Sequence, residues 1–206
     1  MQKNIQQWIA LDIDDTLADT VWYLILNLQK HIWNPENLSV DEIISKYKYT
    51  FNIPYYNNKQ SEKIINDILT SNQKQKNIKP IKWTQTYIKK INKIVPIKAY
   101  ITTRPDCIYD GTAKWLKDNW FPTAEIIMRP PNIKTQDWNK RKAEILQKLY
   151  PNIIWIIDDN AWLIEHIDNS YQGKIFLYDK EGNKEKTQAG KNREKIYTTI
   201  QNIYQQ

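Results

Sequence analysis

Short runs of apolar residues recur along the chain and predict the strands of a sheet. The residues from Trp8 to Leu11 are apolar, and the run IIWII, from Ile153 to Ile157, contains no polar position. A run without alternating polar residues is typical of a strand that is buried on both faces of a parallel sheet. Three other segments have the length and composition of strands: residues 97–102, 125–128 and 174–178.

Between these runs, apolar residues recur at the spacing of three or four that one face of a helix requires. The helices predicted in this way span residues 18–32, 39–47, 61–69, 83–94, 110–119, 137–149, 161–167 and 192–204. Strands that alternate with helices predict an α/β fold, a Rossmann-like open parallel sheet with helices on both faces. Ligands of such sheets bind beyond the carboxyl ends of the strands.

The chain between residues 14 and 102 is longer than a bare α/β unit needs. We therefore expect residues 34–80 to fold as a small helical cap inserted after the first strand, with residues 1–33 and 81–206 forming the core domain. Caps of this kind cover a site and exclude water from it. The loop from Tyr47 to Tyr56 is rich in aromatic residues, which either contact the substrate by stacking on a base or form the cap's own core.

Carboxylates gather where two of the predicted strands end. The stretch LDIDDTLADT places Asp12, Asp14 and Asp15 directly after the first strand, and Asp158 and Asp159 follow IIWII. Like charges at this range repel one another, and a desolvated carboxylate is unfavourable unless a cation compensates it. Hard oxygen ligands from neighbouring strand ends suit Mg²⁺ better than zinc.

The overall charge indicates the kind of partner, and the cysteine content indicates the compartment. The chain of 206 residues has a formal net charge of +7 and a pI near 9.2, which favours anionic partners such as phosphorylated or nucleic-acid substrates. The only cysteine, Cys107, excludes an internal disulfide and is expected to be a small buried thiol in a reducing cytoplasm. Residues 1–7 are polar and lack a signal-peptide pattern, and no apolar stretch is long enough to span a membrane. We therefore expect a cytoplasmic protein without a membrane partner, and its oligomeric state stays open.

Four segments in order resemble the motifs of the haloacid dehalogenase-like phosphatase superfamily. They are DIDDT, then YITTR at the end of a strand, then a lysine-bearing helix, then IIDDN, and together they cover residues 8–168. The resemblance implies a Mg²⁺-dependent enzyme that works through an aspartyl-phosphate intermediate. It assigns Asp12 as the nucleophile, and Asp14 as the general acid and base that also binds the metal through its backbone carbonyl. Thr102 would hydrogen-bond the phosphoryl oxygens.

The same resemblance assigns the metal site and a lysine. Asp158 and Asp159 would hold Mg²⁺ together with Asp12 and Asp14. The resemblance does not decide whether Asp158 or Asp159 is the direct ligand. The motif lysine neutralises the phosphate and the nucleophile, and the candidates are Lys134, Lys140 and Lys142. Lys142 is preferred because it begins K-A-E-I-L, the spacing most like the family's lysine followed by an apolar pair.

Two subgroups of the superfamily share further features with this chain. Arg104, in TTRP, resembles an arginine of the polynucleotide kinase 3'-phosphatases that helps to bind the substrate phosphate; the alternative is a surface arginine before a proline turn. Thr103 is a further candidate for substrate binding, as is Thr16, which is expected to stabilise its loop rather than react. The helix and turn after TTRP resemble the 5'(3')-deoxyribonucleotidases through Thr112, Trp115, Leu116 and Pro122.

Together these observations predict a phosphomonoester phosphatase that acts on a nucleotide or on the terminal phosphate of a nucleic acid. The acid at Asp14 favours phosphoryl transfer over dehalogenation, because an alkoxide needs a proton to leave and a halide does not. One alternative is a phosphatase of a small non-nucleotide metabolite. A second is a non-catalytic nucleic-acid-binding protein on the same fold, although a pure binder has no need of a paired nucleophile and acid.

Overall fold

The computed structural model describes residues 7–178 and 192–204, so residues 1–6 of the polar amino terminus lie outside it. Five parallel strands form one sheet, in the order β3-β2-β1-β4-β5. The strands are β1 (Trp8–Leu11), β2 (Ile97–Pro105), β3 (Glu125–Arg129), β4 (Ile153–Asp158) and β5 (Lys174–Leu177). The predicted α/β fold with a parallel sheet is confirmed. The strand order reverses its direction of growth at β1, between β2 and β4.

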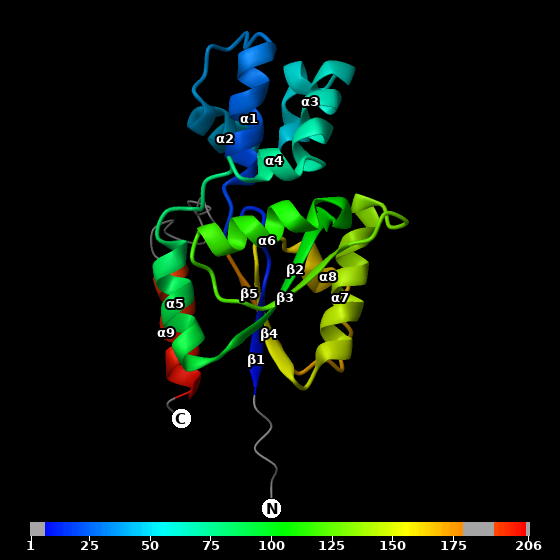
Figure 1. The fold of residues 1–206 in the computed structure, drawn as a ribbon. Coiled ribbons are helices and arrows are strands. Elements are labelled where there is room, and N and C mark those ends of the chain that lie inside the picture. Colours follow the sequence, from blue (N-terminus) through cyan, green and yellow to red (C-terminus); the bar gives the residue numbers. More distant parts are fainter. Residues whose placement is uncertain (1–6, 179–191, 205–206) are drawn as a thin grey trace, which may run out of the picture.

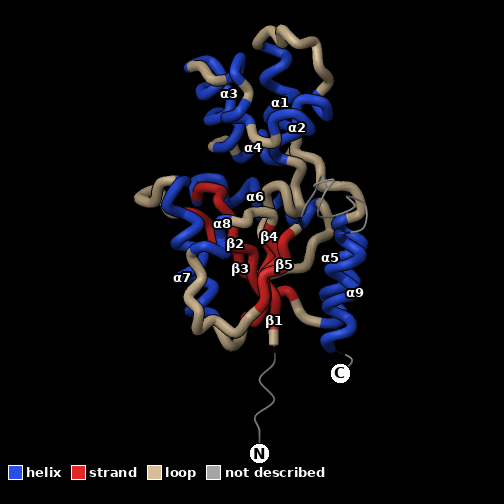
Figure 2. Tube along the Cα trace, turned by 180° about the vertical axis from the view of Figure 1, so that it is seen from behind, coloured by secondary structure: helices blue, strands red, loops and turns tan. Residues whose placement is uncertain are grey.

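Helices cover both faces of the sheet because side chains of successive strand residues point to opposite faces. Ile9 and Leu11 of β1 pack into the cluster that includes α5 (Thr84–Ile94), α6 (Tyr109–Asp118) and α9 (Asn192–Tyr204). Ala10 belongs to the opposite cluster, with α7 (Trp138–Leu149) and α8 (Trp162–Glu165). Figures 1 and 2 show α5 beside α9, with α7 on the other side of the sheet. All six residues of β4 are buried, as its apolar run predicts.

A helical insert follows β1 and lies beyond the carboxyl ends of the strands (Figure 1). It contains α1 (Thr20–His31), α2 (Val40–Tyr47), α3 (Lys59–Leu69) and α4 (Asn72–Gln75), with two short 3-10 turns between α2 and α3. One apolar cluster joins Ile25 and Leu28 of α1 to Ile43 and Ile44 of α2 and to Ile64 of α3. The insert therefore begins with α1, and the boundary expected between residues 33 and 34 passes through it.

The two chain segments that lead into and out of the insert pair with each other. Ile81 N donates to Leu17 O at 2.8 Å, and Asp19 N donates to Lys79 O at 2.8 Å. Ala18 and Pro80 form an antiparallel bridge between them. The insert thus joins the core through a short two-stranded neck, residues 17–19 and 79–81, that lies directly after the acidic loop.

A second attachment joins the insert to α6 of the core. Gly111 N donates to Asn72 Oδ1 at 2.6 Å, and Asn72 Nδ2 donates to Cys107 O at 3.2 Å. A Cβ at Gly111 would lie 2.6 Å from Asn72 O, so this close approach requires glycine. The buried indole of Trp115 donates to Ile78 O at 2.6 Å. Two attachments on different sides hold the insert over the sheet.

The structure decides whether Cys107 and the aromatic residues of the loop from Tyr47 to Tyr56 are buried. Cys107 is exposed and not buried, because it lies in the short turn between β2 and α6 where the chain leaves the sheet. In the loop from Tyr47 to Tyr56, Tyr56 is buried in the core of the insert, whereas Tyr49 and Phe51 are exposed and stack on each other with centroids 5.2 Å apart. No helix among the described residues is both long and apolar enough to cross a membrane.

The start of α2 offers a test of the insert's stability. Ser39 and Glu42 form a capping box, in which each residue bonds the backbone of the other. We expect Ser39→Ala to lower the free energy of unfolding by about 1 kcal/mol, measured by urea denaturation. The control Ser45→Ala changes an exposed serine of the same helix and should have little effect. Equal stability of the two variants would contradict the assignment.

Candidate functional site

Three charged side chains meet at the point where the strand order reverses. Asp12 follows β1 and Asp158 ends β4, and these strands are neighbours, with Asp12 N donating to Ile157 O at 2.9 Å. Lys142 of α7 lies between the two carboxylates: its Nζ is 2.6 Å from Asp12 Oδ1 and 2.6 Å from Asp158 Oδ2. All three residues are at most 3% exposed. They form a buried cluster at the switch point, where open α/β sheets bind their ligands.

The sequence of α7 accounts for the position of the lysine. Trp138, Lys142 and Leu146 are spaced four residues apart, lie on one face of the helix, and are all buried. Trp138 and Leu146 pack against the sheet. Lys142 lies between these two residues on the helix and is therefore held over the strand ends. Of the other candidate lysines, Lys134 precedes the helix and Lys140 lies on its outer face, and both are exposed.

The cluster shifts the proton affinities of its members. Burial raises the pKa of the Asp12 carboxyl to about 7, although the neighbouring Lys142 ammonium acts in the opposite direction. Burial alone would lower the pKa of Lys142, but the charges of Asp12 and Asp158 outweigh it and raise the pKa above its ordinary value. The lysine therefore remains charged, and Asp12 holds a proton more readily than an ordinary aspartate while Lys142 is its main cation.

A third carboxylate completes an acidic site. One oxygen each from Asp12, Asp158 and Asp159 lies within 4.8 Å of the others. Thr16 Oγ1 donates to Asp159 Oδ1 at 3.4 Å, and Asn160 N donates to Asp158 Oδ1 at 2.9 Å. Partial removal from water, together with the charges of Asp12 and Asp158, raises the pKa of Asp159 well above its usual range. One lysine cannot neutralise three ionised carboxylates, which is why Asp12 and Asp159 hold protons more readily than ordinary aspartates. A divalent cation such as Mg²⁺ would replace those protons, and this oxygen donor set fits such a cation.

Asp14 points to a different set of partners. Arg104 donates two hydrogen bonds to its carboxylate, from Nε at 3.0 Å and from Nη2 at 2.9 Å, both to Oδ1. Thr20 Oγ1 donates to Oδ1 at 2.6 Å, and Thr102 Oγ1 is 3.4 Å from Oδ2. Burial raises the pKa of Asp14, but the Arg104 charge and the hydrogen bonds from Arg104 and Thr20 together lower it below its ordinary value. The structure thus favours the carboxylate form of Asp14.

Arg104 is buried rather than exposed at the mouth of the crevice. It is 2% exposed, its Nη1 lies 3.5 Å from Thr112 Oγ1, and its guanidinium carbon lies 5.5 Å from the centre of the Trp115 ring. Its backbone N donates to Thr102 Oγ1 at 3.3 Å. Beside it, the Thr103 carbonyl accepts from Arg129 Nε at 3.1 Å. A contact of Arg104 or Thr103 with a substrate phosphate stays a prediction.

The third aspartate of LDIDDTLADT has a structural contact. Asp15 has a φ of 55°, in the left-handed region that Asp and Asn tolerate better than most residues. Its Oδ1 accepts from Val21 N at 3.2 Å, in the first turn of α1. The three aspartates therefore diverge: Asp12 faces the lysine, Asp14 faces the arginine, and Asp15 bonds the start of the insert.

Sequence reasoning missed two polar contacts of the site. Thr20 is the first residue of α1 and ties the insert to Asp14; its place within the acidic stretch was the only available signal. Asn160 bonds Asp158 through its backbone, Asn139 Oδ1 through Nδ2 at 3.2 Å, and Trp162 N through Oδ1 at 3.0 Å. The pattern IIDDN contains this asparagine but does not show where its side chain bonds.

Comparison with known proteins gives a result for the fold alone. No protein-family model matches the chain, and no curated protein matches its sequence. Among solved structures, it is similar to two structures of a dehalogenase, one of which contains an intermediate complex. Each has a TM-score of 0.54 and 12% sequence identity, over 88% of both chains. The chain shares the overall fold of these dehalogenase structures. In this fold, the described residues place the acidic cluster at the carboxyl edge of the sheet, beneath the insert.

The bridging lysine can be tested through stability. Lys142→Met leaves the buried carboxylates of Asp12 and Asp158 without their cation, so we expect the free energy of unfolding to fall by about 3 kcal/mol in EDTA. MgCl₂ should recover part of this loss, because a divalent cation neutralises the same carboxylates. Urea denaturation measures both values. The exposed Lys140→Met on the same helix is the control, and equal losses in the two variants would refute the role of Lys142.

Proposed function

We propose that this chain is a Mg²⁺-dependent phosphomonoester phosphatase that acts on a nucleotide or on the terminal phosphate of a nucleic acid. The observation that carries the proposal is the convergence of Asp12, Lys142 and Asp158 in one buried cluster, with Asp14 two residues from Asp12 along the chain. A nucleophile, a cation beside it, a metal ligand and a proton-transfer group are the components that phosphoryl transfer through an enzyme carboxylate requires. The net charge of +7 supports an anionic substrate.

The proposed reaction has two steps. In the first, an Asp12 carboxylate oxygen attacks phosphorus, the bond from phosphorus to the ester oxygen breaks, and Asp14 gives a proton to the departing alkoxide. In the second, Asp14 takes a proton from water and the water oxygen attacks phosphorus. The bond from phosphorus to the Asp12 oxygen breaks, which releases inorganic phosphate and regenerates the Asp12 carboxylate. Lys142 holds positive charge next to Asp12 in both steps and stabilises the charge that develops on the phosphoryl group.

The two proposed steps require different protonation states of Asp14. The contacts with Arg104 and Thr20 favour the carboxylate, which is the form that activates water in the second step. The first step needs the protonated form. Arg104 and Thr20 also fix the direction of the carboxyl group, so their proposed contribution is to orient Asp14 for both proton transfers.

Asp12, Asp158 and Asp159 would hold the metal, together with the backbone carbonyl of Asp14. Mg²⁺, when bound, supplies positive charge beside the nucleophile and the substrate phosphate. Thr102 and Lys142 would hold the phosphoryl oxygens. The hydroxyl of Thr16 bonds Asp159 and thereby supports one of the proposed ligands.

Three other activities compete with the proposal. The similar solved structures are those of a dehalogenase. A halide leaves without a proton, so Asp14 and its buried arginine would have no task in that reaction. A phosphatase of a small metabolite would use the same core chemistry, with a different contact surface on the insert. A nucleic-acid binder without catalysis would not require Lys142 between two buried carboxylates.

The enzymatic proposal is tested by phosphate release from p-nitrophenyl phosphate in MgCl₂. We expect Asp12→Asn to lower the rate by about 1,000-fold or more, because it removes the nucleophile of a catalytic unit, and EDTA to abolish the wild-type rate. Asp15→Asn is the matched control, since this carboxylate of the same loop bonds α1, and its rate should stay within a few-fold of wild type. A wild-type rate equal to that of Asp12→Asn on phosphate esters, or turnover of chloroacetate alone, would overturn the proposal.

The role of Arg104 is tested by comparing two leaving groups. The quantity kcat/KM covers the steps up to transfer of the phosphoryl group to Asp12. We expect Arg104→Met to lower kcat/KM for an alkyl ester, such as a nucleoside monophosphate, at least about tenfold more than for p-nitrophenyl phosphate, whose leaving group departs without a proton. Equal losses for both esters would instead assign Arg104 to the substrate phosphate. Arg104→Lys, which keeps the charge but loses the planar fork, checks that folding is intact.

A further inference from the structure

A long interval of the chain carries positive charge with no acidic residue in it. No Asp or Glu occurs between Asp67 and Asp106, whereas this interval contains many lysines. It covers α4, the neck that leaves the insert, α5 and β2. We call six exposed residues of this interval the basic strip: Lys76, Lys79, Lys82, Trp83, Lys89 and Lys93.

The residues of the basic strip follow one path of the backbone. Figure 1 shows that the chain runs from α4 at the base of the insert, across the neck, and down α5 on one side of the core. Lys89 and Lys93 are four residues apart and share the outer face of α5, because Ile88 and Ile91 bury the opposite face. Within the described part of the chain, Lys76, Lys79, Lys89 and Lys93 form no salt bridge. Their charge is therefore available to a partner.

Trp83 places a large, exposed aromatic ring among the lysines of the strip. Its side chain is 59% exposed although it is large and apolar, and its φ of 74° lies in the left-handed region that side chains seldom adopt. The Lys82 ammonium lies 5.6 Å from the centre of the indole ring. An exposed ring flanked by lysines is the arrangement on which single-stranded nucleic acids stack a base while their phosphates are neutralised.

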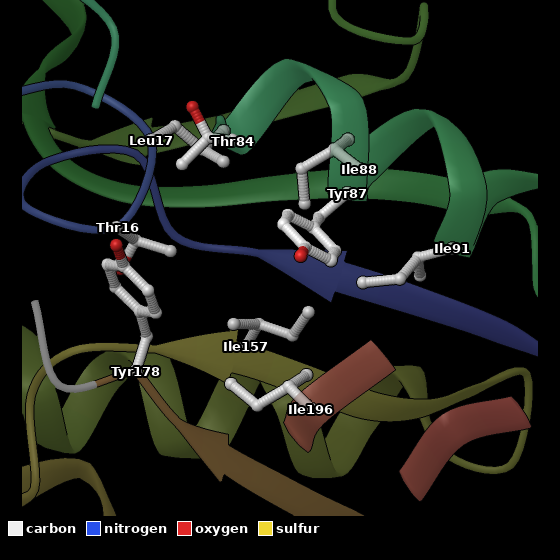
Figure 3. Close-up of a pocket in the computed structure, with 9 residues that line it drawn as sticks. All are labelled: Thr16, Leu17, Thr84, Tyr87, Ile88, Ile91, Ile157, Tyr178 and Ile196. Carbon is white, nitrogen blue, oxygen red and sulfur yellow. The ribbon is translucent and has the colours of Figure 1, made fainter. Parts of the chain in front are cut away.

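The strip leads to the candidate active site. Lys79 O accepts from Asp19 N, so the strip passes the end of the loop that carries Asp12 and Asp14. Figure 3 shows Thr84, the residue after Trp83, beside Leu17 and on the same apolar pocket as Thr16. Thr16 in turn bonds Asp159 of the acidic site. A strand lying on the strip would thus approach the site along the neck.

We propose that the basic strip binds the backbone of single-stranded nucleic acid, with Trp83 stacking on one base, and directs the strand's end toward Asp12. The inference rests on the proposed function only in its last clause, because binding to the strip requires no catalysis. Charge complementarity favours a polyanion, and the exposed indole favours nucleic acid over an acidic protein, which offers no bases to stack. An indole also suits the surface of an anionic membrane, so membrane binding is an outcome of the test.

Binding is measured by fluorescence anisotropy with an unphosphorylated single-stranded oligonucleotide, in an Asp12→Asn background so that catalysis plays no part. The combination of Lys76→Gln, Lys79→Gln, Lys89→Gln and Lys93→Gln should weaken binding at least about tenfold at low salt. It should also reduce the slope of log K against log salt by about 3, since each phosphate contact with a single strand contributes about 0.7.

Two matched variants separate the strip from general charge and from general exposure of aromatic rings. The combination of Lys30→Gln, Lys59→Gln, Lys63→Gln and Lys148→Gln removes the same number of exposed charges outside the strip and should have a much smaller effect. Trp83→Leu should weaken binding about tenfold without changing the salt slope, because stacking involves no counterion release. Trp120→Leu is its control, since Trp120 is 75% exposed and also has a positive φ, of 61°, but lies outside the strip.

Several outcomes would overturn the inference. They are absence of oligonucleotide binding at low salt, equal effects of the strip and control lysines, and no effect of Trp83→Leu. Binding to phosphatidylserine vesicles as tight as to the oligonucleotide would assign the strip to a membrane surface instead. Failure of phosphate release from p-nitrophenyl phosphate would remove the proposed enzyme but leave the binding result standing, so the two claims fail separately.

Discussion

The site depends on one ammonium group held between two buried carboxylates. Removing Asp12 and Asp158 from water is unfavourable for their charged forms, and Lys142 at 2.6 Å from each compensates that cost. The requirement explains why α7 carries a lysine on its buried face and why β1 and β4 must be neighbours. One ammonium group cannot neutralise all the carboxylates of the acidic site, so a divalent cation could bind there in place of their protons. Stability and the proposed chemistry therefore use the same three residues.

A second network ties the insert to the site. The Asp14 carboxylate accepts hydrogen bonds from Arg104 of the core and from Thr20 in the first turn of α1. It therefore lies at the junction of the core and the insert. The same arginine packs on Trp115, whose indole donates to Ile78 O, next to the neck segment that leaves the insert. Both ends of the insert thus reach the group proposed to transfer protons.

The fold could be predicted because its signals are local. The apolar runs at β1 and β4 show strands buried on both faces, and polar residues directly after them mark the strand ends where the site lies. The spacing of Trp138, Lys142 and Leu146 likewise indicates a lysine on a buried helix face. The remaining features depend on contacts between distant segments. An apolar face on α1 does not reveal whether it packs on the sheet or on α2, and TTRP does not show that Arg104 turns inward to Asp14. The exposure of Cys107 follows from its place in the turn after TTRP, which the general tendency of free cysteines to be buried does not reveal.

The account makes Asp12 the group that carries the phosphoryl unit, next to a metal held by Asp158 or Asp159. A crystal structure of the protein with Mg²⁺ and beryllium fluoride, which mimics a phosphoryl group on a carboxylate, tests this most directly. The account predicts density for the fluoride complex joined to the Asp12 carboxylate, with Mg²⁺ bound by Asp12 and one of the two later aspartates and Lys142 beside the complex. An unmodified Asp12, or a metal bound away from these carboxylates, would contradict it.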